Sequence, residues 1–196
     1  MDERTIETYS AAAGRFAAEW RDQPPPTDMY ALLQRYFIPG GSTADIGCGS
    51  GRDVAWLNSN GFPTVGYDAA DGLLSQAAAD YPSLDFRRAA LPALDVIANG
   101  TFDNVLCETV IMHLPPAEVT AACARLLDIL KPAGVLYLSW RVAEGDSIRD
   151  AAGRLYAAFD PARVRDGLRP ADILLDVEDV NLSSGKRVHR VVARRR

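Results

Sequence analysis

Cysteine and histidine are scarce in this 196-residue chain, and each shortage excludes a kind of site. The three cysteines, Cys48, Cys107 and Cys123, are odd in number and widely spaced, and no Cys-x-x-Cys pair occurs. This pattern argues against a disulfide framework and predicts a reducing compartment. The two histidines, His113 and His189, lie far from the cysteines and from each other, without metal-ligand spacing. We therefore expect no metal.

The chain also lacks an apolar run long enough to cross a bilayer and a recognisable secretory leader. Its first ten residues, MDERTIETYS, carry acids where a signal peptide needs positive charge and an apolar stretch. We expect a cytoplasmic protein without a membrane partner. The formal net charge of −5 disfavours a nucleic-acid partner, and we expect the terminal Arg194–Arg196 to be solvated.

The sequence does contain a regular alternation of apolar strands and amphipathic helices. An N-terminal helix carrying Ile6 to Trp20 is predicted to end at residues 23–26, and a second helix carries Met29 to Phe37. Strands are then predicted at 42–47, 63–68, 84–88, 102–108 and 135–140, with helices at 52–60, 71–80, 116–130 and 147–159. Alternation of this kind predicts a parallel sheet with helices on both faces. Residues 171–180 and 186–195, joined through Gly185, predict a closing antiparallel hairpin.

Three glycines stand at alternate positions where the first strand gives way to a helix. In DIGCGSG, Gly47, Gly49 and Gly51 follow Asp45. Glycine permits a tight turn and lets a ligand approach the backbone closely, at the strand ends where open α/β sheets bind nucleotide-like ligands. A plain turn needs only one glycine, so three favour a ligand site.

The spacing of these glycines distinguishes between ligands. Dinucleotide sites need G-x-G-x-x-G, whereas the sixth position here is Arg52, and no GK[ST] of a P-loop follows. Asp45 would repel a phosphate but suits a positively charged ligand. A nicotinamide oxidoreductase is therefore disfavoured.

Four stretches in order resemble the motifs of the class I S-adenosylmethionine-dependent methyltransferases. They are ADIGCGSGRDVAWL (44–57), VGYD (65–68), FDNVLCETVIMHLP (102–115) and LLDILKPAGVLYLSW (126–140). The resemblance implies a Rossmann-like, doubly wound seven-stranded α/β sheet, mostly parallel with an antiparallel last strand. It also implies a single domain over 1–196, with a helical lid at 1–38 and a cofactor-binding core at 39–196. The implied cofactor is S-adenosylmethionine, and the product S-adenosylhomocysteine.

The same resemblance implies a set of cofactor-binding positions. Asp68, at the end of the second strand, would hold the ribose hydroxyls, since a carboxylate accepts both. Where the family often has an acid that reads adenine, this chain has Ala90, so the backbone N–H of Ala90 or Leu91 would have to serve. The full implied set is Asp45, Gly47, Cys48, Gly49, Gly51, Asp68, Ala69, Ala90, Leu91 and Glu108.

Five residues are candidates for the acceptor side of the site. Glu108, at a strand end, is a proton acceptor or a solvated acid, and His113 is a candidate base or a loop-shaping residue. Tyr9 closes the lid or packs in the core, and Arg141 binds an anionic substrate or forms an ion pair. Trp140, beside it at the strand end, is the remaining substrate candidate.

The resulting hypothesis is in-line methyl transfer to a small-molecule acceptor by a monomer or homodimer, without a nucleic-acid or membrane partner. The alternative is a non-catalytic S-adenosylmethionine-binding protein or partner subunit that kept the fold. Intact Gly47, Gly49, Gly51 and Asp68 weigh against loss of binding.

Overall fold

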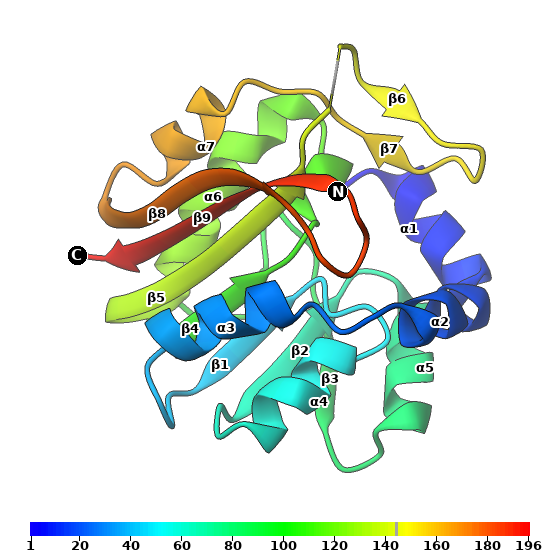
Figure 1. The fold of residues 1–196 in the computed structure, drawn as a ribbon, viewed down its shortest axis with the longest axis horizontal. Helices are drawn as coiled ribbons and strands as arrows, with labels where there is room; N and C mark the ends of the chain where they lie inside the picture. Colours follow the sequence, from blue (N-terminus) through cyan, green and yellow to red (C-terminus); the bar gives the residue numbers. More distant parts are fainter. Residues whose placement is uncertain (144) are drawn as a thin grey trace.

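A seven-stranded sheet forms the centre of the computed structural model, which describes residues 1–143 and 145–196 (Figure 1). Its strand order is β3-β2-β1-β4-β5-β9-β8. The strands are β1 (Thr43–Ile46), β2 (Thr64–Asp68), β3 (Asp85–Arg88), β4 (Phe102–Cys107), β5 (Leu130–Arg141), β8 (Ala171–Val180) and β9 (Arg187–Arg195). Strands β1 to β5 pair in parallel, whereas β9 runs antiparallel to both β5 and β8. The predicted mixed sheet and closing hairpin are confirmed.

Helices cover both faces of the sheet because its central strands are apolar on both sides. Along β5, Val135 and Tyr137 pack in one core cluster and Leu136 and Leu138 in another, as the two-residue period of a strand requires. The first cluster contains residues of α3 (Thr27–Tyr36) and α4 (Arg52–Ser59). The second contains residues of α6 (Val119–Asp128) and α7 (Ala162–Gly167).

The N-terminal segment forms two helices, so the prediction of one helix through Trp20 is wrong. Helix α1 (Glu3–Ala11) and helix α2 (Ala13–Asp22) meet at Ala12, whose φ of −117° and ψ of 24° are not helical. Asp2 caps α1 by accepting a hydrogen bond from the Thr5 N–H at 2.9 Å. Both helices pack on α5 (Asp71–Asp80) through a small apolar cluster that includes Phe16 and Leu73.

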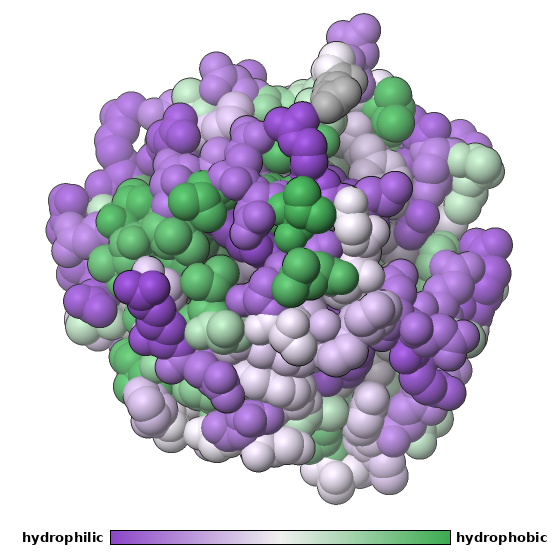
Figure 2. Space-filling view, in the orientation of Figure 1, coloured by the Kyte–Doolittle hydropathy of each residue, from purple (hydrophilic) through white to green (hydrophobic). Residues whose placement is uncertain are grey.

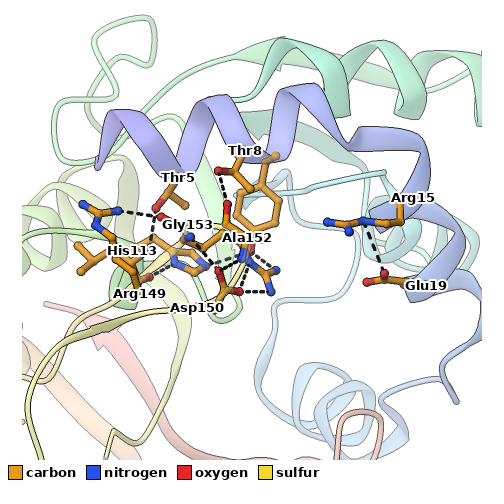
Figure 3. Close-up of polar contacts among 12 residues, drawn as sticks. Thr5, Thr8, Arg15, Glu19, His113, Arg149, Asp150, Ala152 and Gly153 are labelled. Atoms are coloured by element: carbon orange, nitrogen blue, oxygen red, sulfur yellow. Dashed lines mark hydrogen bonds and ion pairs between the residues drawn. The ribbon is translucent and has the colours of Figure 1, made fainter.

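The helix predicted at 147–159 is also wrong, because this segment forms a short hairpin of β6 (Ile148–Arg149) and β7 (Leu155–Tyr156). The turn is built by Asp150, whose Oδ1 accepts hydrogen bonds from the N–H groups of Ala152 at 3.1 Å and Arg154 at 2.9 Å. Gly153 supplies a φ of +98°. The hairpin lies against α1, where the Thr8 hydroxyl donates to the Ala152 carbonyl (Figure 3).

Two smaller boundaries also differ from the prediction. The helix expected at 116–130 begins as a 3-10 turn (Pro116–Glu118), continues as α6 and ends at Asp128. Strand β5 starts at Leu130, which pairs with Phe102 across an irregularity in the ladder. A second 3-10 turn, Ile111–His113, follows β4 and brings His113 under the N-terminal helices.

Strand β8 forms an edge of the sheet and leaves apolar side chains exposed. Ile173, Val177 and Val180 are each more than a third exposed. Figure 2 shows hydrophobic residues gathered on the side of the molecule where β8 lies in Figure 1. Four acids alternate with these residues, which disfavours pairing of this edge with another sheet; they are Asp172, Asp176, Glu178 and Asp179.

Candidate functional site

Two adjoining cavities open at the carboxyl ends of β1, β2 and β4, where doubly wound sheets bind their ligands. The first, of about 640 Å³, has mainly apolar walls, and we call it the apolar cavity. The second, of about 920 Å³, has mainly polar walls, and we call it the polar cavity. Six residues line both cavities: Tyr9, Trp20, Gly47, Gly49, Glu108 and Thr109.

The glycine loop lies on the floor between the two cavities. Gly47 and Gly49 have φ values of +80° and +56°. A Cβ on Gly47 would lie 2.3 Å from Val110 Cγ2, and one on Gly49 would lie 2.9 Å from the Trp20 ring. Both positions therefore require glycine for conformation and for space. The loop leaves room for a ligand only because these side chains are absent.

The other loop residues have different places. Cys48 is buried and lines the polar cavity. Gly51 lines neither cavity among the described residues; it precedes α4 with a φ of +84°, and a Cβ there would lie 2.7 Å from Phe86 Cζ. The predicted ligand loop is thus in part a helix start that must pack tightly.

Asp68 is a buried carboxylate at the end of β2, on the wall of the apolar cavity. Its Oδ2 accepts a hydrogen bond from the Gly49 N–H at 2.9 Å, and its Oδ1 accepts one from the Ala70 N–H at 2.8 Å. Burial raises the pKa of Asp68, although these backbone donors act in the opposite direction. Ala69, its neighbour, lines the same cavity. Asp68 therefore joins the glycine loop to the end of the second strand.

Asp45 is the second buried acid of the site, and it lines the polar cavity. Burial raises the pKa of Asp45 well above its usual range, and repulsion from Asp53 and Asp68 adds to this effect. Asp45 and Asp68 are thus two buried acids beside one loop, where a positively charged ligand would offset the cost of ionising them.

Glu108 lies directly after β4, and it touches both cavities. Its Oε2 accepts a hydrogen bond from the Ser139 hydroxyl, and its Oε1 accepts one from Asn181 Nδ2 at 3.1 Å. Loss of solvation raises the pKa of Glu108 to about 7. A carboxyl that titrates near neutrality and is held by two donors is suited to proton transfer.

The backbone beside Glu108 is strained. Thr109 has a φ of +55°, which is unusual for a β-branched residue. The Thr109 N–H donates to two oxygens of Ser139, the backbone carbonyl and Oγ, each at 3.1 Å. These contacts hold the strained residue in place at the junction of the two cavities.

His113 is buried and lines the apolar cavity. Its Nδ1 lies 2.5 Å from the Leu155 carbonyl oxygen, and its Nε2 lies 3.1 Å from the Tyr9 hydroxyl. Burial lowers the pKa of His113 to about 4. The neutral ring therefore donates from Nδ1 and accepts at Nε2, which makes it a bridge between β7 and α1.

Three aromatic residues of the N-terminal helices form the roof: Tyr9, Phe16 and Trp20. Phe16 and Trp20 are stacked with ring centroids 5.7 Å apart, and the Tyr9 ring lies 4.9 Å from Phe16. Tyr9 and Trp20 line both cavities. Tyr9 was predicted from the sequence. Trp20 was not among the sequence candidates, although it ends the same run of apolar residues at helical spacing, which was the available signal.

Of the three remaining sequence candidates, Ala90, Trp140 and Arg141, only Arg141 lines one of the two cavities among the described residues. Ala90 is exposed and lines neither cavity among the described residues, whereas its neighbours Ala89 and Leu91 line the apolar cavity. Trp140 stacks on His189 with ring centroids 4.4 Å apart and lines a separate hollow. Arg141, beside it, lines the polar cavity.

Several residues of the site had no sequence signal. Ser139 and Asn181 reach Glu108 from positions 31 and 73 residues away, so no local pattern links them. Arg154 and Tyr156 line the polar cavity from the hairpin that was predicted as a helix.

The described residues contain neither a metal-binding cluster nor a membrane-spanning helix. Outside residue 144, no group of three or more His, Cys, Asp or Glu side chains is placed to hold a metal ion. In the same part of the chain, no helix combines the length and the hydropathy that a bilayer crossing requires.

The fold and site define a doubly wound α/β protein with a ligand crevice at the carboxyl edge of its sheet. Residues 44–134 match the methyltransferase domain family. This segment is a class I S-adenosylmethionine-dependent methyltransferase domain, as the motifs within it predicted.

Individual relatives agree with this assignment. A ubiquinone biosynthesis O-methyltransferase of Hahella chejuensis is 34% identical over 119 residues, covering 58% of this chain and 49% of the relative. The chain thus spans about half the length of that curated relative. The 1,6-didemethyltoxoflavin-N1-methyltransferase of Burkholderia thailandensis superposes with a TM-score of 0.78 at 20% identity, over 98% of this chain and 87% of that one. A methyltransferase of Methanosarcina mazei superposes with a TM-score of 0.72 at 17% identity, over 84% of this chain and 96% of that one.

The residues present fit S-adenosylmethionine, the cofactor of this family. A Cβ on Gly47 or Gly49 would collide with Val110 or Trp20, both of which line the apolar cavity, so the backbone of the loop lies bare beside the ligand space. The carboxylates around the loop suit a sulfonium cation, and the wall formed by Ala69, Leu73 and Leu91 suits an apolar ring face.

Proposed function

We propose that this protein transfers a methyl group from S-adenosylmethionine to a hydroxyl or amine of a small-molecule acceptor. The observation that supports it is the position of Glu108, which lies where the apolar and polar cavities meet. In this proposal the apolar cavity holds the nucleoside and the polar cavity admits the acceptor. Asp68 binds the ribose hydroxyls, and the backbone at Leu91 borders the adenine.

The cofactor supplies an electrophilic methyl carbon on a positively charged sulfur. The chain's main task is to align the acceptor with that carbon and to exclude water, so proximity provides much of the rate. Glu108 takes the proton that the acceptor loses as its lone pair bonds to the methyl carbon; the electrons of the broken carbon–sulfur bond stay on sulfur. Ser139 and Asn181 hold the carboxylate in position through their hydrogen bonds.

His113 positions the roof in this proposal and does not act as the base. Both of its ring nitrogens already have partners, Leu155 and Tyr9. Its lowered pKa keeps the ring neutral at physiological pH. The ring therefore fixes the Tyr9 hydroxyl above the apolar cavity.

A small acceptor agrees with the polar cavity and with the activities for which the relatives are named. The polar cavity of about 920 Å³ is roofed by helices and a hairpin of this chain. The curated relative reported above is a ubiquinone biosynthesis O-methyltransferase, and one structural neighbour has 1,6-didemethyltoxoflavin bound. We also propose a cytoplasmic location, because the three cysteines are free and buried.

The test uses methyl-labelled S-adenosylmethionine, purified protein and a deproteinised metabolite extract. Wild type should yield a labelled small molecule, Glu108→Gln should lower the rate at least tenfold, and Asp68→Ala should abolish thermal stabilisation by the cofactor. No labelled product with cofactor binding intact would instead favour a binding protein. An unchanged thermal shift in Asp68→Ala would remove the assignment of the ribose contact.

A further inference from the structure

We propose that the acceptor carries an anionic group, a carboxylate or a phosphate, which binds Arg141 in the polar cavity. This inference rests on the proposed methyl transfer and narrows its substrate class. The hydroxyl or amine to be methylated faces Glu108, so the anionic group stays unmodified.

The first argument comes from the ion pairs of the polar cavity. Three arginines line it. Arg52 Nε lies 3.1 Å from Asp53 Oδ1, and Arg154 Nη2 lies 2.6 Å from Asp150 Oδ2. Arg141 has no carboxylate partner among residues 1–143 and 145–196. Among those residues it is therefore the arginine of this wall without a carboxylate within 4 Å, and a half-buried guanidinium of this kind favours an anionic ligand.

The second argument is that Arg141 is held in place. Its guanidinium carbon lies 5.5 Å from the centroid of the Tyr156 ring. Tyr156 is itself fixed by an edge contact with His113, whose ring centroid is 5.1 Å away. The backbone N–H of Arg141 contacts Met112 Sδ at 3.3 Å. A guanidinium stacked on a fixed ring loses less freedom when it binds a planar or tetrahedral anion.

The third argument is an unused donor on the same cavity. Ser183 Oγ is buried and has no hydrogen-bond partner among the described residues, although Ser183 lines the polar cavity. Asn181 holds this turn, because its Oδ1 accepts hydrogen bonds from the N–H groups of Ser183 at 3.0 Å and Ser184 at 2.9 Å. A buried hydroxyl without a partner is costly, and an anionic or other polar ligand would satisfy it.

Two sources share this anionic chemistry, namely the acceptor and the methionine carboxylate of the cofactor. Asp45 and Asp53 line the same cavity beside the glycine loop, where they suit the cofactor's ammonium and sulfonium groups. Arg52, which follows the loop, has Asp53 as its partner. The measurements must therefore separate the acceptor from the cofactor.

The experiment compares wild type with Arg141→Met, Arg141→Lys and a control, Arg169→Met. Arg169 is exposed, pairs with Asp166 and lies outside both cavities among the described residues. Labelled products formed from the metabolite extract are passed over an anion exchanger at pH 7. Calorimetry gives the dissociation constant of S-adenosylhomocysteine, which also reports whether each variant is folded.

We expect the exchanger to retain the labelled products of wild type and of Arg169→Met. At limiting extract concentration, Arg141→Met should lose at least tenfold in rate, as expected for a charge-assisted hydrogen bond, and Arg141→Lys should regain part of it. The affinity of Arg141→Met for S-adenosylhomocysteine should stay within about twofold of that of wild type.

Three results would overturn the proposal. Products that flow through the exchanger would show a neutral or cationic acceptor, and an Arg141→Met rate equal to that of Arg169→Met would show that the guanidinium does not bind it. A tenfold loss of S-adenosylhomocysteine affinity in Arg141→Met would assign Arg141 to the cofactor's carboxylate. Absence of any labelled product contradicts methyl transfer itself and is thereby distinguished from these outcomes.

Discussion

The Tyr9 hydroxyl lies 3.1 Å from His113 Nε2, and this contact connects the first helix of the chain to the segment that follows β4. Tyr9 donates, because the other ring nitrogen of His113 donates to the Leu155 carbonyl. Arg154 Nη1 in turn donates to the Tyr9 oxygen at 3.2 Å. One phenol thus joins the roof, the strand end and the hairpin of β6 and β7.

Neutral His113 predicts a stability that falls as the pH is lowered. Its folded pKa of about 4 lies below the unfolded value of 6.5, so between these values the unfolded chain binds a proton that the folded chain does not. This difference lowers the free energy of unfolding by up to roughly 3 kcal/mol between pH 6.5 and pH 4. Urea unfolding of wild type and His113→Asn across this range measures it. An equal pH slope in both would contradict the prediction.

Removing the Tyr9 hydroxyl should weaken the roof without removing its aromatic packing. Tyr9→Phe leaves His113 Nε2 without its donor, which should cost about 1–3 kcal/mol of unfolding free energy. Tyr36→Phe is the matched control, because Tyr36 lines neither cavity among the described residues. Chemical denaturation compares the two variants. Equal stabilities would show that the contact is energetically neutral.

Glu108 predicts pH effects of the opposite sign. Its folded pKa of about 7 lies above the usual value of 4.5, so the folded chain binds the extra proton and loses stability as the pH rises from 4.5 to 7. This slope partly offsets that of His113 in wild type. Glu108→Gln should therefore steepen the loss of stability on acidification. Methyl transfer by wild type should rise with pH through about 7, and a flat profile would exclude Glu108 as the base.

The space around Gly49 predicts a loss of binding that backbone strain alone does not explain. Gly49→Ala would bring a Cβ 2.9 Å from the Trp20 ring, whereas Gly61, with a φ of +82°, has no atom within 4 Å of the same position. Gly61→Ala should cost about 1–2 kcal/mol for the left-handed backbone and leave S-adenosylhomocysteine binding unchanged. Gly49→Ala should cost more and weaken binding at least tenfold. Similar affinities of the two variants for S-adenosylhomocysteine would show that the ligand does not bind against the loop at Gly49.

The sheet and the glycine loop could be predicted because their signals are local. Alternating strands and helices specify a doubly wound sheet, and the spacing of Gly47 and Gly49 behind Asp45 marks the ligand edge. The position of Asp68 at this edge could be predicted because it ends a strand in a recognisable motif. These features each depend on a few neighbouring residues.

The remaining features depend on residues that meet only in the folded chain. The apolar spacing of 147–159 suits a helix, but Asp150 and Gly153 form a turn that is held by contacts to α1, more than 140 residues earlier. Arg149 pairs with Asp2 at 2.7 Å, for example. The partners of Glu108 are remote in the same way. The sequence pattern therefore predicted where Glu108 lies, but not the side chains that donate hydrogen bonds to it.

Six residues face both cavities, so two ligands bound there would share part of their protein surroundings around Glu108. Each ligand would form part of the other's surroundings and would contact the same Tyr9 and Trp20 rings. The first ligand to bind would order these rings, so the second ligand would not have to supply the entropy cost of ordering them. Each ligand would therefore raise the affinity of the other, and by the same factor. Cooperative uptake would then follow from a shared boundary, without any movement of the sheet.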